Sequence, residues 1–360
     1  MKRRRQACLS MALLAALLTG CGGLLETEYV SVTPHTEQRA VEEHENVLTA
    51  ENYLSLKNAI LSLVENGVEE GSIRIYEYSG DVEKDVAEAT YEVAKNDPLG
   101  AYAVDYMTHE CVLIVSYYEV RVNIKFRRTP EQIASIQRAP SINALEELVG
   151  QTMSSYGEEL TARLSYYSGQ DVEAMVREYY RDHPATAMEM PEVTVHIYPD
   201  QGYVRIIEVL MEYDQTAEEL MARQDAVATS TRAAREYVRY RDTETEKLQL
   251  LYTYLLERFS YRPGITTTPV YSFLCEGVAG SEGCAKSLQI ICDEMELECR
   301  TVEGSRGGEP YFWNIVCVDG VYCHADLLRS LLEGRDSLTL YQDSAMTDYY
   351  WDAGQYPACP

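Results

Sequence analysis

The sequence predicts an α+β protein with two tandem α-β-α-β-β modules followed by a C-terminal α+β domain. The first observation is a recurrence, because the same order of amphipathic helices and alternating strands occurs twice, with Ser79 and Ser168 at equivalent places. The second is Asp319-Gly320 between two apolar runs, which is a hairpin signal near the C-terminus. The third is the length of 360 residues, which is enough for two or three hydrophobic cores.

The N-terminus carries a predicted targeting signal. Basic residues Lys2 to Arg5 precede an apolar run, Cys8 to Leu18, which is too short to span a bilayer and is typical of a secretory signal peptide. The following Leu-Thr-Gly-Cys, ending at Cys21, resembles a bacterial lipoprotein signal. This resemblance implies that Cys21 is diacylated. We therefore expect a lipid-anchored protein at the cell membrane, facing outside the cytoplasm, with the membrane as a partner through the lipid on Cys21.

The next stretch, Gly22 to about Ala50, is polar and predicts a tether with one short strand at Tyr29–Val32. Its histidines, His35 and His44, lack metal-ligand spacing, so we predict no metal site there. The predicted organisation is a signal peptide at 1–20, a lipidated tether at 21–50, α/β modules at 51–138 and 139–223, and a linking helix with the C-terminal domain at 224–360.

The two modules have the same predicted plan. The first has a helix at 53–66, a strand at 72–78, a helix ending at 94, and strands at 102–106 and 111–126. The second has a helix at 144–156, a strand at 161–167, a helix ending at 180, and strands at 192–198 and 202–213. Neither module shows a nucleotide loop or a metal cluster, so no cofactor is predicted. The chain has 29 Tyr against 4 Phe, and repeated tyrosines in such modules are more often strand packing, with surface recognition as the alternative role.

A helix from about Gln224 to Phe259, broken near Arg241-Asp242-Thr243, is predicted to join the modules to the C-terminal domain. A loop with three glycines then leads into a second helix, whose apolar residues recur at helical spacing: Ala285, Leu288, Ile291, Cys292 and Met295. A helix N-terminus favours an anion, which makes this junction a suitable place for a nucleophile.

The hairpin near the C-terminus predicts which side chains share a face. With Asp319 and Gly320 as a two-residue turn, Val318 pairs with Val321. Counting outward places Trp313 opposite Asp326 and Tyr311 opposite Leu328. The residues predicted on one face are Tyr311, Trp313, His324, Asp326 and Leu328.

These pieces together resemble the bacterial transglutaminase-like (papain-like) superfamily over about residues 244–360. The family pattern is G-x-x-C-x-G-Y-A at a helix start, H-A-W-N on one strand and Y-H-x-D on the next, with Cys, His and Asp as the triad. Here the corresponding segments read A-G-S-E-G-C-A, Y-F-W-N and Y-C-H-A-D. The resemblance implies a cysteine-protease-like fold, and it places the nucleophile at Ser281, the base at Tyr311 and the orienting acid at Asp326.

The two substitutions remove the reactive pair. A thiol has a pKa near ~8.5, which a neighbouring imidazolium lowers further, whereas a serine hydroxyl needs an adjacent base. An ordinary tyrosine has a pKa near ~10 and is neutral at pH 7. We therefore predict that thiol chemistry is lost and that Asp326 hydrogen-bonds Tyr311 or a backbone N–H.

Two rescue hypotheses stay open at this point. Cys284 lies three residues from the nucleophile position, so a shifted Cys284–His324 dyad is one alternative to a core cysteine and a structural histidine. Ser281 is either a nucleophile activated by Tyr311 or the N-cap of the helix. The same face carries Trp313, which with Asn314 is expected in packing.

The charge and the motifs lead to three hypotheses for function. A net charge of −27 disfavours nucleic acid and direct adsorption to anionic membranes. The leading hypothesis is an extracytoplasmic lipoprotein with a degenerate transglutaminase-like domain that binds protein, peptide or cell-wall material. The alternatives are an enzyme acting on peptide or amide bonds through Ser281 or Cys284, and a purely structural envelope component.

Overall fold

The computed structural model describes residues 47–239, 241–258, 262–264, 266–335 and 337–360. The predicted signal peptide, Cys21, the strand at 29–32, His35 and His44 all lie outside these residues. In the part of the chain that is described, no helix has the length and apolar character needed to cross a membrane.

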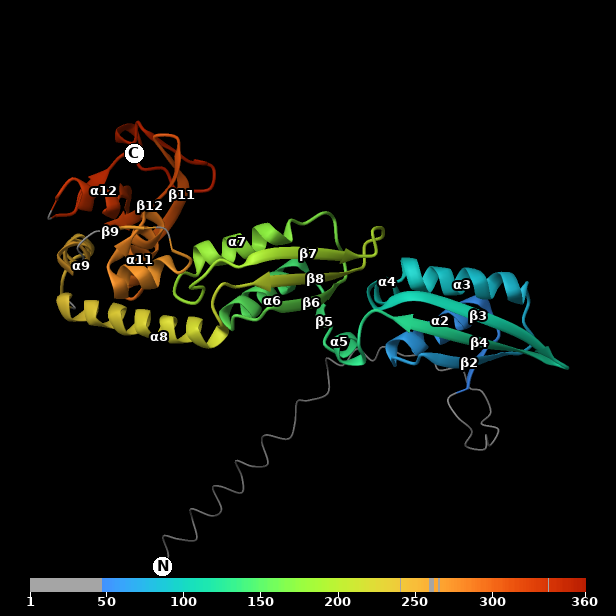
Figure 1. Cartoon of the computed structure of the whole chain (residues 1–360). Helices are drawn as coiled ribbons and strands as arrows, with labels where there is room; N and C mark the ends of the chain where they lie inside the picture. Colours follow the sequence, from blue (N-terminus) through green and yellow to red (C-terminus); the bar gives the residue numbers. More distant parts are fainter. Residues whose placement is uncertain (1–46, 240, 259–261, 265, 336) are drawn as a thin grey trace, which may run out of the picture. The chain divides into compact units, whose positions relative to one another are not determined.

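The first module is a four-stranded sheet with helices on one face (Figure 1). Its elements are β1 (Leu48–Ala50), α2 (Tyr53–Glu65), β2 (Glu70–Ile75), α3 (Val82–Asn96), α4 (Pro98–Ala103), β3 (Val104–Ile114), β4 (Tyr117–Phe126) and α5 (Pro130–Ala134). The strand order is β1-β2-β4-β3, in which β1 and β2 are parallel and the other pairs antiparallel. Buried residues of α2 and α3 meet alternate residues of β2 and β4, such as Ile73 and Val120, to form one core.

The second module has the same strand order, β5-β6-β8-β7. Its elements are β5 (Gln137–Ala139), α6 (Ile142–Ser154), β6 (Glu159–Leu164), α7 (Val172–Asp182), β7 (Glu192–Tyr198) and β8 (Arg205–Glu212). The helices begin at equivalent caps, because the side chains of Asn52 and Ser141 cap α2 and α6, while those of Asp81 and Asp171 cap α3 and α7. The predicted tandem modules are therefore confirmed, with a short parallel edge strand added at the start of each.

Several predicted element boundaries were wrong. The strand expected at 102–106 begins only at Val104, because Tyr102 and Ala103 belong to α4. The strand expected at 111–126 is interrupted, because β3 ends at Ile114 and β4 begins at Tyr117, and Val115-Ser116 between them lacks the Gly, Asn or Asp typical of two-residue turns. The linking helix begins at Ala217 rather than near Gln224, because Thr216 and Glu219 form a capping box. It comprises α8 (Ala217–Ala234), the short η1 (Arg235–Tyr237) and α9 (Glu244–Arg258), with the break near the predicted place.

The C-terminal domain contains a five-stranded sheet with the order β14-β13-β12-β11-β15. Its elements are β9 (Arg262–Pro263), α10 (Pro269–Tyr271), η2 (Ser272–Glu276), β10 (Val278–Ala279), α11 (Ser281–Asp293), β11 (Cys299–Arg306), β12 (Glu309–Val318), β13 (Val321–Ala325), α12 (Leu327–Leu332), β14 (Leu340–Tyr341), η3 (Asp343–Ala345) and β15 (Tyr349–Tyr350). Helices α9 and α11 contribute to the core on one side, and a smaller cluster around Trp313 contains the C-terminal residues Met346, Tyr349 and Cys359. The α+β fold class is confirmed.

The predicted hairpin register is confirmed from Val318↔Val321 to Asn314↔Ala325. Beyond Ala325 the prediction was wrong for Leu328, which lies in α12 rather than opposite Tyr311. The reason is Asp326, whose side chain accepts a hydrogen bond from the N–H of Arg329 and caps α12, so that the strand ends at Ala325, three residues before Leu328.

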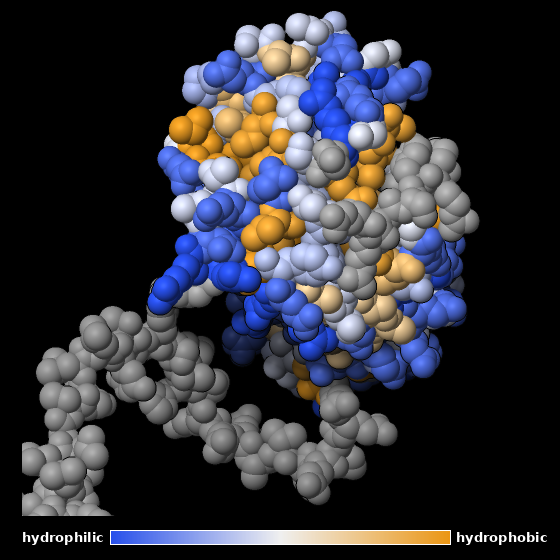
Figure 2. Space-filling model, turned by 90° about the vertical axis from the view of Figure 1, so that its left-hand side faces the viewer, coloured by the Kyte–Doolittle hydropathy of each residue, from blue (hydrophilic) through white to orange (hydrophobic). Residues whose placement is uncertain are grey.

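The surface mixes apolar and polar groups. Figure 2 shows hydrophobic residues interspersed among hydrophilic ones over the face that it presents. Scattered exposed apolar side chains are normal for folded proteins. At one turn of the first module, in contrast, several apolar side chains are exposed close together in the sequence.

Candidate functional site

The nucleophile position lies at the start of α11. Ser281 is the first residue of this helix, and Gly280, with an extended backbone, is its N-cap without a side-chain hydrogen bond. The predicted N-cap role of Ser281 was therefore wrong, since the first helical bond already runs from the Cys284 N–H to the carbonyl of Gly280. The Ser281 hydroxyl is partly exposed. The helix can approach α10 closely because residue 283 is glycine: a Cβ there would lie 2.6 Å from the carbonyl oxygen of Pro269.

Cys284 faces the core. Its side chain is 1% exposed and belongs to the same hydrophobic cluster as Leu288 and Ile291. Burial raises the pKa of the thiol well above its ordinary value, and the nearby charge of Asp326 raises it further. The thiol is thus protonated at neutral pH, which is the state of an inert structural cysteine.

Tyr311 and Asp326 are hydrogen-bonded to each other. The Tyr311 hydroxyl donates to Oδ1 of Asp326 at 3.1 Å, and the Tyr349 hydroxyl donates to Oδ2 at 2.6 Å. The backbone N–H of Arg329 donates to Oδ1 at 2.8 Å, and Nη1 of Arg306 lies 3.8 Å from Oδ2. Both carboxylate oxygens therefore have partners. We call Tyr311, Asp326, Tyr349 and Arg306 the tyrosine cluster.

Burial dominates the electrostatics of the tyrosine cluster. Burial raises the pKa of Tyr311 well above its ordinary value, with the Asp326 charge as the next cause, so its hydroxyl is a neutral donor. Burial also raises the pKa of Asp326, although the hydrogen bonds from Tyr349, Arg329 and Tyr311 oppose this. Asp326 is 1% exposed and serves as a helix cap and an acceptor for two phenols.

His324 is held between two partners on the same face of the hairpin as Asp326. The indole N–H of Trp313 donates to its Nδ1 at 2.9 Å, and its Nε2 lies 2.8 Å from Oδ1 of Asp343. Because an indole only donates, Nδ1 must be the acceptor, and Nε2 carries the proton that bonds Asp343. Burial lowers the pKa of His324. Both nitrogens are committed, and no hydrogen bond between His324 and Cys284 occurs among the described residues.

One group of potential metal ligands occurs in the described chain. The donor atoms of His324, Asp343 and Cys359 lie within 4.8 Å of one another. A histidine that binds a metal through Nε2 normally carries its proton on Nδ1 and donates it to an acceptor. Here Nδ1 faces the N–H of Trp313, which is a donor, so metal binding would set two N–H groups against each other. The residues therefore do not fit a metal in this arrangement.

The structure brings together only part of the predicted triad. Tyr311 and Asp326 are in contact, and α11 is fixed to β12 because the Asn314 side chain donates to the carbonyl of Ala285 at 2.9 Å. No hydrogen bond from the Ser281 hydroxyl to Tyr311 occurs among the described residues. Sequence reasoning missed Tyr349, which β15 places beside Asp326 by pairing with β11 at Arg306↔Tyr349. It also missed Lys286, a lysine that is 1% exposed.

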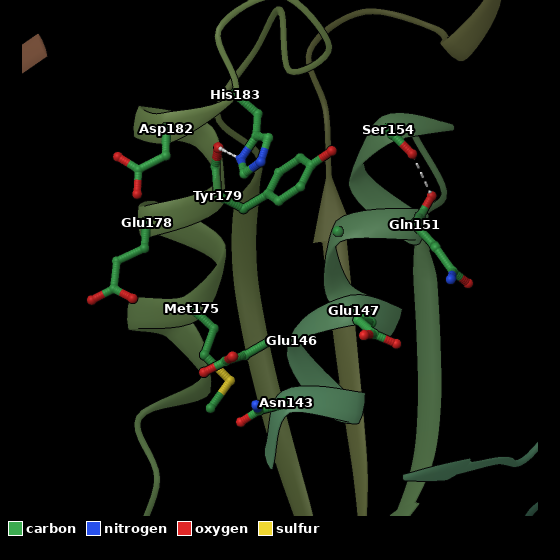
Figure 3. Close-up of a pocket in the computed structure, with 11 residues that line it drawn as sticks. Asn143, Glu146, Glu147, Gln151, Ser154, Met175, Glu178, Tyr179, Asp182 and His183 are labelled. Carbon is green, nitrogen blue, oxygen red and sulfur yellow. Dashed lines mark hydrogen bonds between the residues drawn. The ribbon is translucent and has the colours of Figure 1, made fainter. Parts of the chain in front are cut away.

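A groove between α6 and α7 offers a second candidate site, in the second module. Its volume is about 650 Å³. Its lining residues are Asn143, Glu146, Glu147, Gly150, Gln151, Ser154, Met175, Glu178, Tyr179, Asp182 and His183. Figure 3 shows the ring of Tyr179 pointing from α7 toward α6, and Glu146 and Met175 pointing toward each other across the groove. Gly150 leaves room for this ring, since a Cβ there would lie 2.8 Å from Cε2 of Tyr179.

The rim of this groove is acidic. Asp182 pairs with Arg181 at 2.7 Å, whereas no ion pair of Glu146, Glu147 or Glu178 occurs in the described part of the chain. Tyr179 stacks on His183 with ring centroids 4.2 Å apart. The groove therefore combines an aromatic and thioether floor with unneutralised carboxylates, which suits a cationic group carried on an apolar stem.

Comparison with known proteins identifies the C-terminal domain. Residues 231–327 match the family model described as the transglutaminase-like superfamily, so this part of the chain is a transglutaminase-like domain. A comparison with curated proteins found no match.

Three solved structures resemble the chain at low identity. The first is a TGase, 11% identical over 53% of this chain and 58% of that chain, with a TM-score of 0.26. The second is a candidate cysteine protease from Cytophaga hutchinsonii, 12% identical over 45% of this chain and 71% of that one, with a TM-score of 0.26. The third is a candidate protease from Parabacteroides distasonis, 10% identical over 70% and 39%, with a TM-score of 0.23. The chain thus spans less than two thirds of the first and third.

Proposed function

We propose that the transglutaminase-like domain of this chain has lost its thiol chemistry and that the protein acts in binding. It does so as a lipoprotein, anchored through Cys21 outside the cytoplasm, that binds protein, peptide or cell-wall material. The observation that carries this proposal is the tyrosine cluster, in which both oxygens of Asp326 are occupied by Tyr311, Tyr349 and a backbone N–H.

The chemistry of each alternative nucleophile supports this reading. A serine needs a base that accepts its proton, and Tyr311 is a neutral phenol whose hydroxyl already donates to Asp326. Cys284 is a buried, protonated thiol. His324, the remaining base of the hairpin, has both nitrogens committed. Loss of a nucleophile or base from such a unit costs several orders of magnitude in rate.

The α6–α7 groove is the place where we expect the ligand. Its acidic rim favours a basic segment of a peptide, because carboxylates that lack an ion pair in the described structure attract cationic groups. Its floor, with Met175 and Tyr179, offers apolar contact to the stem of a lysine or arginine side chain. Neither part of this recognition needs a reactive group.

An assay of amine incorporation into a glutamine peptide tests the loss of chemistry. We expect no activity from the wild type or from Ser281→Ala. The double variant Ser281→Cys with Tyr311→His restores both reactive groups of the family pattern and serves as the positive comparison. Its new thiol should alkylate at lower pH than that of Ser281→Cys alone, because a neighbouring imidazolium stabilises a thiolate. Wild-type activity that disappears in Ser281→Ala would contradict the proposal.

Fluorescence anisotropy with a lysine-rich peptide at physiological salt tests the binding site. The variant Glu146→Lys with Glu178→Lys should lose binding, because it reverses the charge of the rim. The matched control is Glu65→Lys with Glu88→Lys, two exposed residues of the first module, which changes the net charge equally. Equal loss in both variants would mean that the attraction is non-specific.

A further inference from the structure

The β3–β4 turn of the first module has an unusual residue for its backbone. Val115 and Ser116 connect Ile114 with Tyr117, which pair directly, and Val115 has a φ of 45°. A β-branched side chain is disfavoured in this left-handed region, where glycine, asparagine or aspartate is common. The C-terminal hairpin follows that preference, since Asp319 and Gly320 have φ values of 52° and 80° between Val318 and Val321. Backbone conformation therefore does not explain Val115.

The side chains at this turn are apolar and exposed. Val115 is 100% exposed, and its neighbours Leu113 and Val112 are 62% and 55% exposed. We call Val112, Leu113 and Val115 the hairpin tip, and Figure 1 shows this hairpin extending past the helices of its own module. The equivalent hairpin of the second module has a longer connection between β7 and β8, residues 199–204, in which Asp200, Gln201 and Gly202 precede Tyr203 and Val204, which are 66% and 38% exposed. Both hairpins therefore expose apolar groups at the turn, but that of the first module carries three exposed aliphatic side chains there and that of the second carries one.

An aromatic pair lies next to the tip. The rings of Tyr76 and Tyr117 are 5.2 Å apart, and the guanidinium of Arg74 lies 5.7 Å from the Tyr117 ring. Arg74 is itself within 3.9 Å of Glu119, so this charge is compensated. Tyrosines beside exposed aliphatic side chains are typical of protein surfaces at a membrane–water interface, because their rings are apolar and their hydroxyls remain hydrated.

We propose that the hairpin tip inserts into the boundary between headgroups and acyl chains of a bilayer. This inference rests on the proposed anchoring at Cys21. Residues 22–47 separate that cysteine from β1, and a chain of this length reaches at most ~90 Å. The tether thus keeps the first module near the bilayer. The effective concentration of lipid around the hairpin tip is then high, so a tip with low affinity for lipid can still insert.

Two physical limits favour a bilayer over a second copy of the chain as the partner of the hairpin tip. A stable interface with a second copy of the chain buries at least about 1,200 Å² in total, which is more than three aliphatic side chains and a tyrosine pair provide. Insertion beside an existing anchor needs only a few apolar side chains. The net charge of −27 opposes approach to anionic lipid, so the expected surface is zwitterionic.

Tryptophan reporters test insertion. The variants Leu113→Trp and Tyr203→Trp place a reporter on the hairpin of the first and second module, respectively. Residues 1–21 are replaced by a histidine tag that holds the chain on nickel-chelating lipid in phosphatidylcholine vesicles with brominated acyl chains. The L113W reporter should lose emission and shift to the blue, whereas the Y203W reporter should do neither. Equal behaviour of the two reporters overturns the proposal.

A turn variant separates insertion from folding. Val115→Asn with Ser116→Gly, added to L113W, supplies residues that favour the turn, so the thermal midpoint should be unchanged or higher. Bromine quenching should nevertheless be lost. Bromine quenching that persists in the turn variant would contradict insertion. So would a blue shift of the L113W reporter without quenching, if light scattering shows a dimer. Because the tag replaces Cys21, these vesicle experiments test insertion of the hairpin tip without lipidation. Lipidation of Cys21 is tested separately, by the mass of the N-terminal peptide from protein purified from membranes.

Discussion

At the scale of single residues, Asp326 links the fold of the C-terminal domain to the proposed loss of its chemistry. A buried carboxylate costs free energy unless hydrogen bonds satisfy it. In this domain, Tyr311 and Tyr349 supply two of those bonds, and the N–H of Arg329 supplies the third. The same residue that would orient a base in the family therefore stabilises the start of α12 here and accepts hydrogen bonds from two phenols.

Removing either phenol hydroxyl should destabilise the domain. Tyr349→Phe removes the hydrogen-bond donor to Oδ2 of Asp326, which should cost about 1–3 kcal/mol of unfolding free energy. Tyr311→Phe should cost less, because Oδ1 keeps its hydrogen bond from the N–H of Arg329. Urea unfolding measures this cost. Tyr350→Phe is the matched control, because Tyr350 is 67% exposed, and its effect should be small. If all three variants unfold alike, Asp326 does not depend on these bonds.

The contact of Tyr311 with Asp326 was predictable from the sequence, whereas Tyr349 was not. The two-residue turn at Asp319-Gly320 sets the hairpin register, and this register placed Tyr311 and Asp326 on one face. Tyr349 reaches the same place only because β15 pairs with β11, a contact between segments more than 40 residues apart. No local spacing reports such a pairing. The prediction of Ser281 as an N-cap was wrong for a different reason. Serine is favoured at N-caps, but here Gly280 occupies that position through its backbone.

At the scale of elements, α11 buries a charge as well as a cysteine. Nζ of Lys286 lies 3.0 Å from a carboxylate oxygen of Glu282 and donates to the carbonyl of Tyr180 at 3.2 Å. It also lies over the Tyr180 ring. Burial lowers the pKa of Lys286 to about 8, although Glu282 opposes this shift. The helix thus holds a partly compensated ammonium group, and the helical spacing that predicted its core face gave no sign of it.

This lysine should make stability depend on pH. Between pH 8 and the ordinary pKa of 10.5, the unfolded chain binds the proton that the folded chain releases. The unfolding free energy should therefore rise with pH across this window, by up to roughly 3 kcal/mol. Urea unfolding between pH 7 and 9.5 measures the slope, which Lys286→Met should remove. Lys84→Met, at an exposed lysine of α3, should keep it. An unchanged slope in Lys286→Met would contradict the assigned pKa.

Element boundaries were predictable where polar signals mark them. The caps of α2, α3, α6 and α7 are Asn, Asp or Ser, and the predicted helices begin at or near these places. The turn at Val115-Ser116 was missed because both neighbours and Val115 itself are apolar, so the pattern resembled one long strand. The valine at a left-handed turn position is the same observation that supports the membrane inference.

At the scale of the whole molecule, the C-terminal segment completes the transglutaminase-like domain. Asp343 accepts a hydrogen bond from the Cys359 N–H at 3.1 Å and bonds His324 through its other oxygen, while Tyr349 bonds Asp326. These contacts join the C-terminal segment to Asp326, the acid position of the family triad, and to His324, two residues before it. The fold, the tandem modules and the degenerate motif followed from local patterns. The contacts of the C-terminal segment with His324 and Asp326 did not follow from such patterns, because they form only in the folded chain.

The most direct test of the lost thiol chemistry is iodoacetamide labelling of the native protein across roughly pH 5 to 9, with each cysteine assigned by mass spectrometry. Cys275 is exposed and serves as the internal reference, whereas Cys284 is buried. We predict that Cys284 remains unlabelled at every pH until the protein is unfolded in urea, because its thiol is protonated and inaccessible. Rapid labelling of native Cys284 at low pH would reveal an accessible thiolate and contradict the proposed loss of chemistry.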